Sequence, residues 1–97
     1  ILDLHLLKSK ALIENFDLLD GHQKYDLTRN MIAIYLFLQN KKVSHDLVNK
    51  EIRNMLNVES NSIKKNILNK NEFLSNYKEV YNKTFSTILK NIKNGAK

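Results

Sequence analysis

Apolar residues recur along the chain at the spacing of amphipathic helices, and short polar breaks separate the segments. The first segment covers residues 2–19. Its apolar side is formed by Leu4, Leu7, Ala11 and Leu18, with Leu6, Ile13 and Phe16 close by. Such a stripe typically faces a core or a partner subunit. Asp20-Gly21 interrupts the pattern, and we expect Gly21 to adopt the positive φ that ends many helices.

The middle of the chain predicts two more helices. The second covers residues 26–40, with Asp26 as its N-cap, and its segment 31–38 is apolar on every side, which places it centrally. A polar connection at 39–42 follows. The third helix is expected to begin near Ser44 or Asp46 and to end near Asn57. Its inner face is formed by Leu47, Val48, Ile52, Met55 and Leu56.

The last third of the chain predicts a short helix and a long one. The short helix covers residues 60–69 and is mostly Ser, Asn and Lys. The long helix covers residues 72–93 and has the clearest period, with a frayed tail expected from Asn94. Its apolar stripe consists of Phe73, Tyr77, Tyr81, Phe85, Ile88 and Ile92. The chain has no proline and only two glycines, so we predict one compact, all-α, five-helix domain over residues 1–97.

Composition narrows the chemistry of the protein. The absence of cysteine excludes disulfides and thiolate metal sites and suits a reducing compartment, so we expect a cytoplasmic protein. The longest apolar run has eight residues, whereas a membrane span needs about 20. His5, His22 and His45 lack metal-ligand spacing, and there is no glycine-rich phosphate loop or serine nucleophile motif. We therefore expect no enzyme, cofactor, metal or small-molecule ligand.

The distribution of charge points to a polyanionic partner. Residues 1–48 contain as many acidic as basic side chains, and the net charge of +6 therefore resides in residues 49–97. A basic half joined to a neutral half suggests a nucleic-acid-binding face. The competing explanation is the lysine- and asparagine-rich codon usage of an AT-rich genome.

Residues 46–69 have the properties that a helix-turn-helix requires. Ile52 and Leu56 lie four residues apart on the first helix, and Asn57 enters the left-handed region at lower cost than most residues. Val58 is compact and apolar and is expected to fill the gap between the helices. Ile63 and Ile67 are then expected to face inward. The side chains left outside are Ser60, Asn61, Ser62, Lys64, Lys65 and Asn66.

This stretch resembles the helix-turn-helix of LuxR-type regulators and of sigma-factor region 4 over residues 49–67. The matching residues are Asn49-Lys50-Glu51-Ile52, Leu56, Val58, Ser62-Ile63-Lys64 and Ile67. The resemblance implies DNA binding. It departs from those families at Arg53, where they usually have a small residue at the helix contact. The Arg53 stem must therefore follow the apolar surface while its head reaches solvent or a phosphate.

Roles for individual residues follow from placing the second helix of the motif in the major groove. Base contacts are then expected from Ser60, Asn61, Ser62, Lys64 and Lys65. Phosphate contacts are expected from Lys42, Lys50, Arg53 and Lys70. About six phosphate contacts in all would make the binding strongly salt-dependent.

The leading hypothesis is a small transcriptional or plasmid/phage regulator that binds double-stranded DNA as a homodimer. The candidate dimer contact is the stripe of Phe73, Tyr77, Tyr81, Phe85 and Ile88, which alternatively closes the core of the monomer. One alternative is a winged-helix centromere-binding partition protein, although residues 71–93 predict a helix rather than the hairpin of a wing. The other is a non-catalytic protein-binding bundle resembling bacteriocin-immunity proteins, which would bind through the same stripe.

Overall fold

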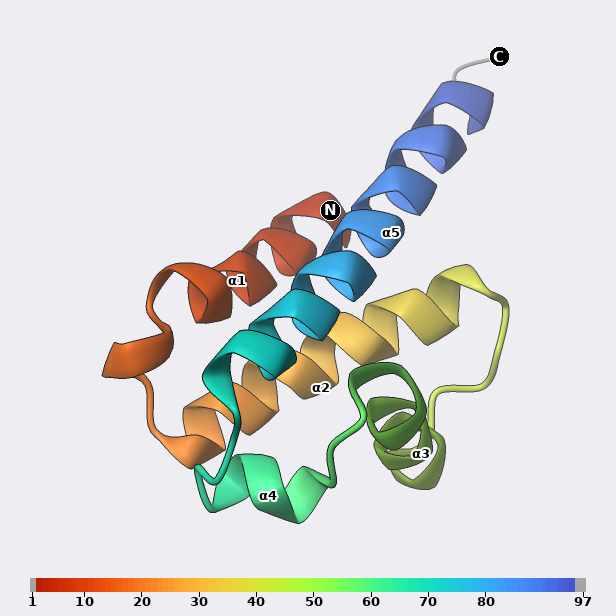
Figure 1. The fold of residues 1–97 in the computed structure, drawn as a ribbon. Helices are drawn as coiled ribbons and strands as arrows, with labels where there is room; N and C mark the ends of the chain where they lie inside the picture. The colour runs from red at the N-terminus through yellow and green to blue at the C-terminus, as the bar shows by residue number, and fades with distance from the viewer. Residues whose placement is uncertain (1, 96–97) are drawn as a thin grey trace.

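The computed structural model describes the backbone of residues 2–95 and the side chains of residues 4–91. Over this part the chain is helical, without a strand, and the predicted all-α class is confirmed (Figure 1). The elements are α1 (Leu2–Glu14), the 3-10 turn η1 (Phe16–Leu18), α2 (Gly21–Leu38), α3 (His45–Leu56), α4 (Ser60–Lys64) and α5 (Lys70–Gly95). No helix over residues 2–95 combines the length and apolar character that a membrane span requires.

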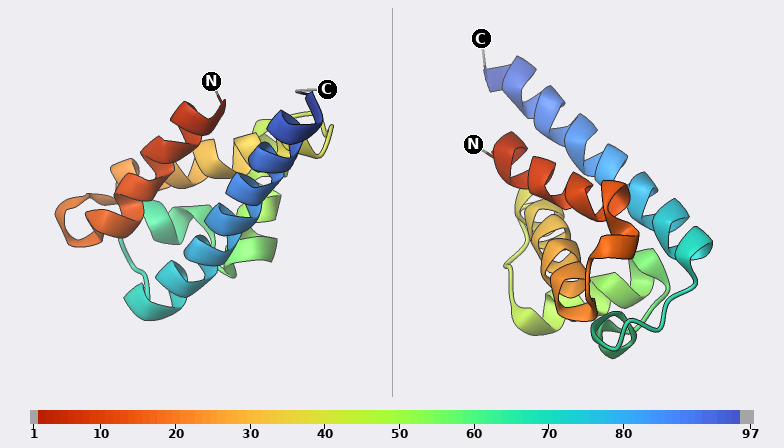
Figure 2. Two further views of the ribbon diagram at one scale, coloured as in Figure 1. Left: turned by 90° about the horizontal axis from the view of Figure 1, so that it is seen from above. Right: turned by 90° about the vertical axis from the view of Figure 1, so that its left-hand side faces the viewer.

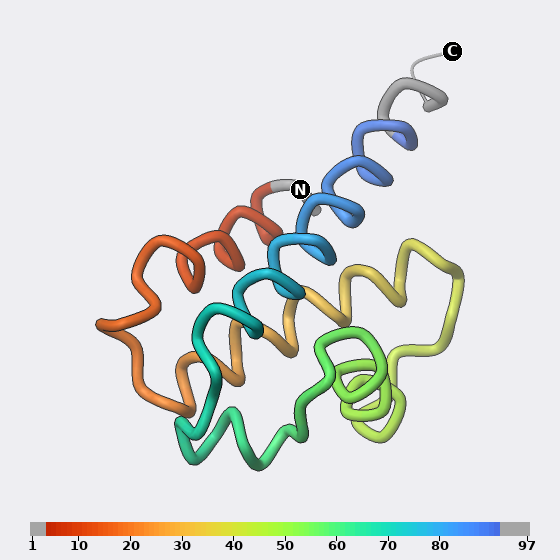
Figure 3. The backbone as a smooth tube through the Cα atoms, viewed as in Figure 1, coloured from red at the N-terminus to blue at the C-terminus, as the bar shows by residue number. Residues whose placement is uncertain are grey.

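Helix α2 is the centre of the fold, as the apolar segment 31–38 predicted. It contacts α1, α3, α4 and α5, and α5 packs across α1 and α2. After α4 the chain turns back beside η1 and the start of α2 before α5 begins (Figure 3). This return is fixed by a contact of the Phe16 and Phe73 rings, whose centroids are 6.1 Å apart. The turn region therefore joins four elements at one corner of the molecule.

Helix α1 packs with a different side from the one predicted. Leu6, Leu12 and, in η1, Phe16 are buried, whereas Leu4, Leu7 and Leu18 remain 64%, 47% and 83% exposed. The helix ends at Glu14, so Leu18 does not continue its phase. The side with Leu6 and Leu12 faces α2 and α5, which leaves the predicted apolar stripe mainly on the outside.

Helix α2 begins five residues earlier than predicted, at Gly21 rather than Asp26. Asp20 is its N-cap, because the Asp20 carboxylate accepts a hydrogen bond from the Gln23 amide (2.8 Å) and the Gln23 side chain accepts one from the Asp20 amide (2.9 Å). Gly21 has no positive φ, so its predicted role as a helix end is wrong. Its small size instead permits a close approach: an alanine Cβ would lie 2.6 Å from the carbonyl carbon of Lys64.

Helix α3 agrees closely with the prediction. Ser44 caps its first turn by accepting a hydrogen bond from the Leu47 amide (3.2 Å). The helix ends at Leu56, and Asn57 follows in the left-handed conformation with φ 57° and ψ 35°. The predicted inner face is confirmed: Val48, Ile52 and Leu56 are buried, and Leu47 and Met55 pack against them.

Helix α4 is shorter than the predicted helix over 60–69. It stops at Lys64, because Asn66 adopts a left-handed conformation (φ 60°) that cannot continue a helix. Ile63 is buried as expected, but Ile67 lies beyond the turn and is 69% exposed, so its predicted inward position is wrong. Helix α5 starts at Lys70 and runs to Gly95, so Asn94 and Gly95 belong to the helix rather than to the predicted tail; residues 96–97 and the side chain of Ile92 lie outside the described residues.

Candidate nucleic-acid interface

Helices α3 and α4 cross steeply at the turn formed by Asn57 and Val58. In Figure 1 α3 is viewed almost along its axis while α4 lies across the view, and in the right-hand view of Figure 2 the two helices exchange these orientations. Val58 is half-buried against the core, and Ile63 is the buried residue on the inner side of α4. This turn therefore sets α4 across the end of its neighbour rather than antiparallel to it, along the lower edge of the molecule in Figure 1.

Arg53 bridges the turn between the two helices. Its guanidinium lies 2.8 Å from the Glu59 carboxylate, and both side chains are mostly exposed. The long Arg53 side chain therefore fits at the helix contact because it extends along the turn into solvent. Its charge is matched by Glu59, which makes Arg53 a weaker candidate for a phosphate contact than its sequence position suggests.

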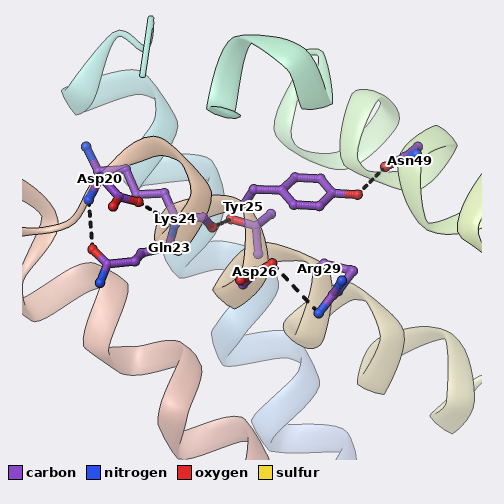
Figure 4. Close-up of polar contacts among 8 residues, drawn as sticks. Asp20, Gln23, Lys24, Tyr25, Asp26, Arg29 and Asn49 are labelled. Carbon is purple, nitrogen blue, oxygen red and sulfur yellow. Dashed lines mark hydrogen bonds and ion pairs between the residues drawn. The ribbon is translucent and has the colours of Figure 1, made fainter. Parts of the chain in front are cut away.

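Ser60, a predicted base contact, is held by α3. Its hydroxyl donates to the Asn49 side-chain oxygen at 2.8 Å. The same oxygen accepts the Tyr25 hydroxyl from α2 at 3.0 Å (Figure 4). One amide side chain thus joins α2, α3 and α4, with His45 in hydrogen-bond contact with the Asn49 amide nitrogen (3.1 Å).

Lys64 is also engaged within the molecule. Its ammonium lies 4.4 Å from the centroid of the Tyr25 ring, a cation–π contact, and the residue is half-buried. The backbone carbonyl of Lys64 is the group that approaches Gly21 so closely. Lys64, a predicted base contact, therefore docks α4 on the first turns of α2.

The predicted site residues that the fold leaves available are few. Asn61 and Lys65 are exposed, Ser62 is half-buried, and within the described part of the chain none of their side chains has a hydrogen bond or ion pair. Lys50 is exposed on α3 and also has no such partner there. Residues 60–70 contain no acidic side chain. We call Lys50, Asn61, Ser62 and Lys65 the α3–α4 surface.

Two of the predicted phosphate contacts are not part of this surface. Lys70 binds Asp17 of η1, with 2.7 Å between the ammonium and the carboxylate. Lys42 is exposed in the loop between α2 and α3, which lies beyond α3 from α4 in Figure 1. Lys50 on α3 and Lys65 directly after α4 are thus the predicted cations that stay exposed and unpaired near the crossing of the two helices, whereas Lys42 lies in a separate loop.

The aromatic stripe of α5 belongs to the core of the monomer. Phe73, Tyr77, Tyr81 and Ile88 are buried and Phe85 is half-buried, so the candidate dimer contact is corrected. The Tyr77 hydroxyl donates to the Ser9 carbonyl at 2.8 Å, and burial raises the pKa of Tyr77. The alternative of a protein-binding bundle also relied on this stripe, whose residues are occupied in the core. No wing follows α4, since residues 67–69 lead directly into α5.

Sequence reasoning missed Lys24, which is buried with 3% exposure on α2. Its ammonium donates to the Asn66 side-chain oxygen at 2.6 Å and lies 3.8 Å from the centroid of the Phe16 ring. Burial lowers the pKa of Lys24. The signal that could have found it is the capping box of Asp20 and Gln23, because a helix that begins at Gly21 turns Lys24 inward. Among the described side chains no group of three or more His, Asp or Glu residues could hold a metal ion.

No protein-family model, curated protein or solved structure matches this chain. The resemblance of residues 49–67 to LuxR-type regulators and sigma-factor region 4 is therefore a similarity of one short motif.

Proposed function

We propose that the protein binds double-stranded DNA with α4 in the major groove and acts as a small transcriptional or plasmid/phage regulator. The observation that carries the proposal is the steep crossing of α3 and α4 at the left-handed Asn57 turn, which leaves a short polar helix at the edge of the molecule. A helix so placed can enter the major groove while its neighbour crosses the backbone.

The roles within the proposed site follow from which side chains are available. Asn61 is the candidate for reading a base, because a carboxamide can pair bidentately with adenine, and Ser62 lies beside it. Lys65 and Lys50 are the candidates for phosphates on either side of the groove. Because α4 has only five residues, we propose contact with few bases and modest sequence specificity.

The salt dependence should be weaker than six phosphate contacts would give. With Lys50 and Lys65 as the main contacts, the logarithm of the binding constant should fall with a slope of about −2 against the logarithm of salt concentration. Raising the salt from about 50 to 200 mM should then weaken binding roughly tenfold. A far steeper slope would mean that other cations, such as Arg53 and Lys70, leave their carboxylate partners for phosphates.

The homodimer stays a prediction, and it needs a surface other than the aromatic stripe. The described structure offers the exposed side chains of Leu4 and Leu7 on α1 and of Leu89 on α5. Helix α1 and the C-terminal half of α5, which carries Leu89, lie away from α4, whereas α5 begins close to the end of α4 (Figure 1). A symmetric pair joined there would point its two α4 helices apart, so we propose that one chain binds DNA through one α4.

The experiment is fluorescence anisotropy of a labelled duplex at low salt, with the wild type and two double charge reversals. Lys50→Glu/Lys65→Glu changes the α3–α4 surface, and Lys8→Glu/Lys90→Glu makes the same change of charge on exposed lysines of α1 and α5. We expect the first pair to weaken binding at least tenfold and the second by less than about threefold. Circular dichroism verifies that all three proteins are folded.

Two results would contradict the proposal. If the wild type does not bind duplex DNA at tens of micromolar protein in low salt, the chain is not a DNA-binding protein of this kind. If both double variants weaken binding equally, the attraction comes from net charge and the α3–α4 surface is not the site.

A further inference from the structure

Helix α4 is docked on the first turns of α2 through three neighbouring residues. Gly21 admits the Lys64 carbonyl, Tyr25 lies under the Lys64 ammonium, and Lys24 donates a hydrogen bond to Asn66, two residues after the end of the helix. Tyr25 also extends to Asn49 on α3 (Figure 4). The C-terminal end of α4 is thus held by α2, and its first residue, Ser60, is held by Asn49 of α3, which Tyr25 of α2 also contacts.

Lys24 is the unusual member of this set because burying an ammonium is unfavourable. Among the described residues no carboxylate lies within ion-pair distance of it, and it is satisfied by one amide oxygen and one ring face. Asp17 and Asp20 act on it only at longer range, and desolvation dominates, so the pKa of Lys24 is lowered. An apolar side chain of similar length would fill the same space without this desolvation cost.

The hydrogen bond from Lys24 acts on the turn that ends α4. Asn66 is left-handed there, and its amide donates to the Ile63 carbonyl at 2.9 Å. The Ile67 amide closes the same turn on the Ser62 carbonyl at 2.9 Å. Lys65 lies within the turn that these two hydrogen bonds close. Fixing the Asn66 side chain therefore also fixes the direction in which Lys65 leaves the helix.

We propose that Lys24 is a positioning residue of the DNA-binding surface: by holding the side chain of Asn66 it keeps α4 and Lys65 in the orientation that contacts DNA. This inference rests on the proposed function. Lys24 itself does not touch DNA, because it is buried. Its role is to stop the turn at residues 65–66 from relaxing, which an apolar residue in its place would not do.

The test combines two variants that remove the two ends of the hydrogen bond. Lys24→Met keeps the length of the side chain and removes its charge, and Asn66→Gly keeps the left-handed turn and removes the acceptor. We expect each variant to raise the dissociation constant for duplex DNA about fivefold or more, as the loss of one well-placed contact does. The melting temperature should stay level or rise in Lys24→Met, a result that a purely structural role would not give.

The double variant separates positioning from direct effects. If Lys24 acted only through net charge and Asn66 only by touching DNA, the two losses would multiply; if they act through one hydrogen bond, the double variant should bind about as weakly as either single variant. Asn40→Gly is the matched control, since Asn40 has the same φ of 60° at the far end of α2 and should leave binding unchanged.

The outcomes distinguish this inference from the proposed function. No binding by the wild type would overturn both. If the wild type binds DNA and both Lys24→Met and Asn66→Gly bind it with the same dissociation constant, the role of Lys24 is overturned and the proposed function stands. The same holds if the losses of affinity multiply in the double variant. If Lys24→Met fails to fold, a fully retained affinity in Asn66→Gly overturns the role, and a reduced one supports it.

Discussion

Replacing Gly21 with alanine is expected to force α4 away from α2. An alanine Cβ at this position would lie 2.6 Å from the carbonyl carbon of Lys64, 2.8 Å from the carbonyl oxygen of Ile63, and closer still to the carbonyl oxygen of Lys64. These are backbone atoms of a helix, so they cannot rotate out of the way as a side chain would. Since ordinary contact begins at 3.4 Å, the two helices have to separate.

The magnitude is the difference between two opposing effects. Alanine favours a helix over glycine by up to about 1 kcal/mol, and less at the first position of a helix. Against this, α4 must shift by roughly 1 Å, and overpacking that moves backbone typically costs about 1–3 kcal/mol. The shift also strains the bonds of Lys24 and Tyr25. We expect a net loss of about 1–3 kcal/mol, or a melting temperature lower by roughly 5–15 °C in a domain of this size.

The measurement is thermal unfolding followed by circular dichroism, with His22→Ala as the control. His22 is the exposed neighbour of Gly21 in the same turn, and its replacement should change stability by less than about 0.5 kcal/mol. DNA binding should also fall in Gly21→Ala, because α4 has moved. A melting temperature that is unchanged or higher would refute the close approach of the two helices.

Three further predictions concern other parts of the fold. Asn57→Gly should raise the free energy of unfolding by about 0.5 kcal/mol and Asn57→Ala should lower it by about 1 kcal/mol, because only the alanine is strained at φ 57°; urea unfolding that ranks them otherwise would argue against the left-handed turn. Asp20→Ala should cost about 1 kcal/mol through loss of the capping box, and an unchanged urea midpoint would contradict the cap. Burial raises the pKa of Tyr77, so the folded state keeps a proton that the unfolded chain loses near pH 10. Its contribution to stability is therefore intact below pH 10 and decreases above it, by up to about 1.4 kcal/mol per pH unit. Tyr77→Phe should be less stable at pH 8 but lose less stability between pH 9 and 11, and parallel pH profiles would contradict the burial of the hydroxyl.

The elements that sequence reasoning predicted well are those whose signals lie within the element. Helix α3 is defined by the cap at Ser44, by apolar residues at helical spacing and by Asn57 at its end, and each of these acts locally. The long apolar period of α5 likewise predicts a helix wherever it packs. The same period did not reveal whether the aromatic stripe faces the monomer core or a partner, because periodicity defines a face and not its neighbour.

The features that were missed depend on residues far apart in the chain. Position 21 requires a residue without a Cβ because the Lys64 carbonyl, 43 positions later, packs against it. Ser60 is turned toward α3 because its hydroxyl donates a hydrogen bond to Asn49. Ile67 keeps the helical spacing of an inward residue, but Asn66 turns the chain before the helix reaches it. The early start of α2 was the exception, since the capping box at Asp20 is a local signal and predicts it.

Gly21 and Lys24 lie on the same turn of α2 and make opposite predictions about stability. Gly21→Ala pushes α4 out, so stability and DNA binding should fall together. Lys24→Met relieves a buried charge while releasing the Asn66 side chain, so binding should fall while stability stays level or rises. If DNA binding depended only on how much of the protein is folded, the two variants would lie on one line of affinity against stability. We expect them to fall on different lines, because α2 sets where α4 lies through Gly21 and which way its last side chains point through Lys24.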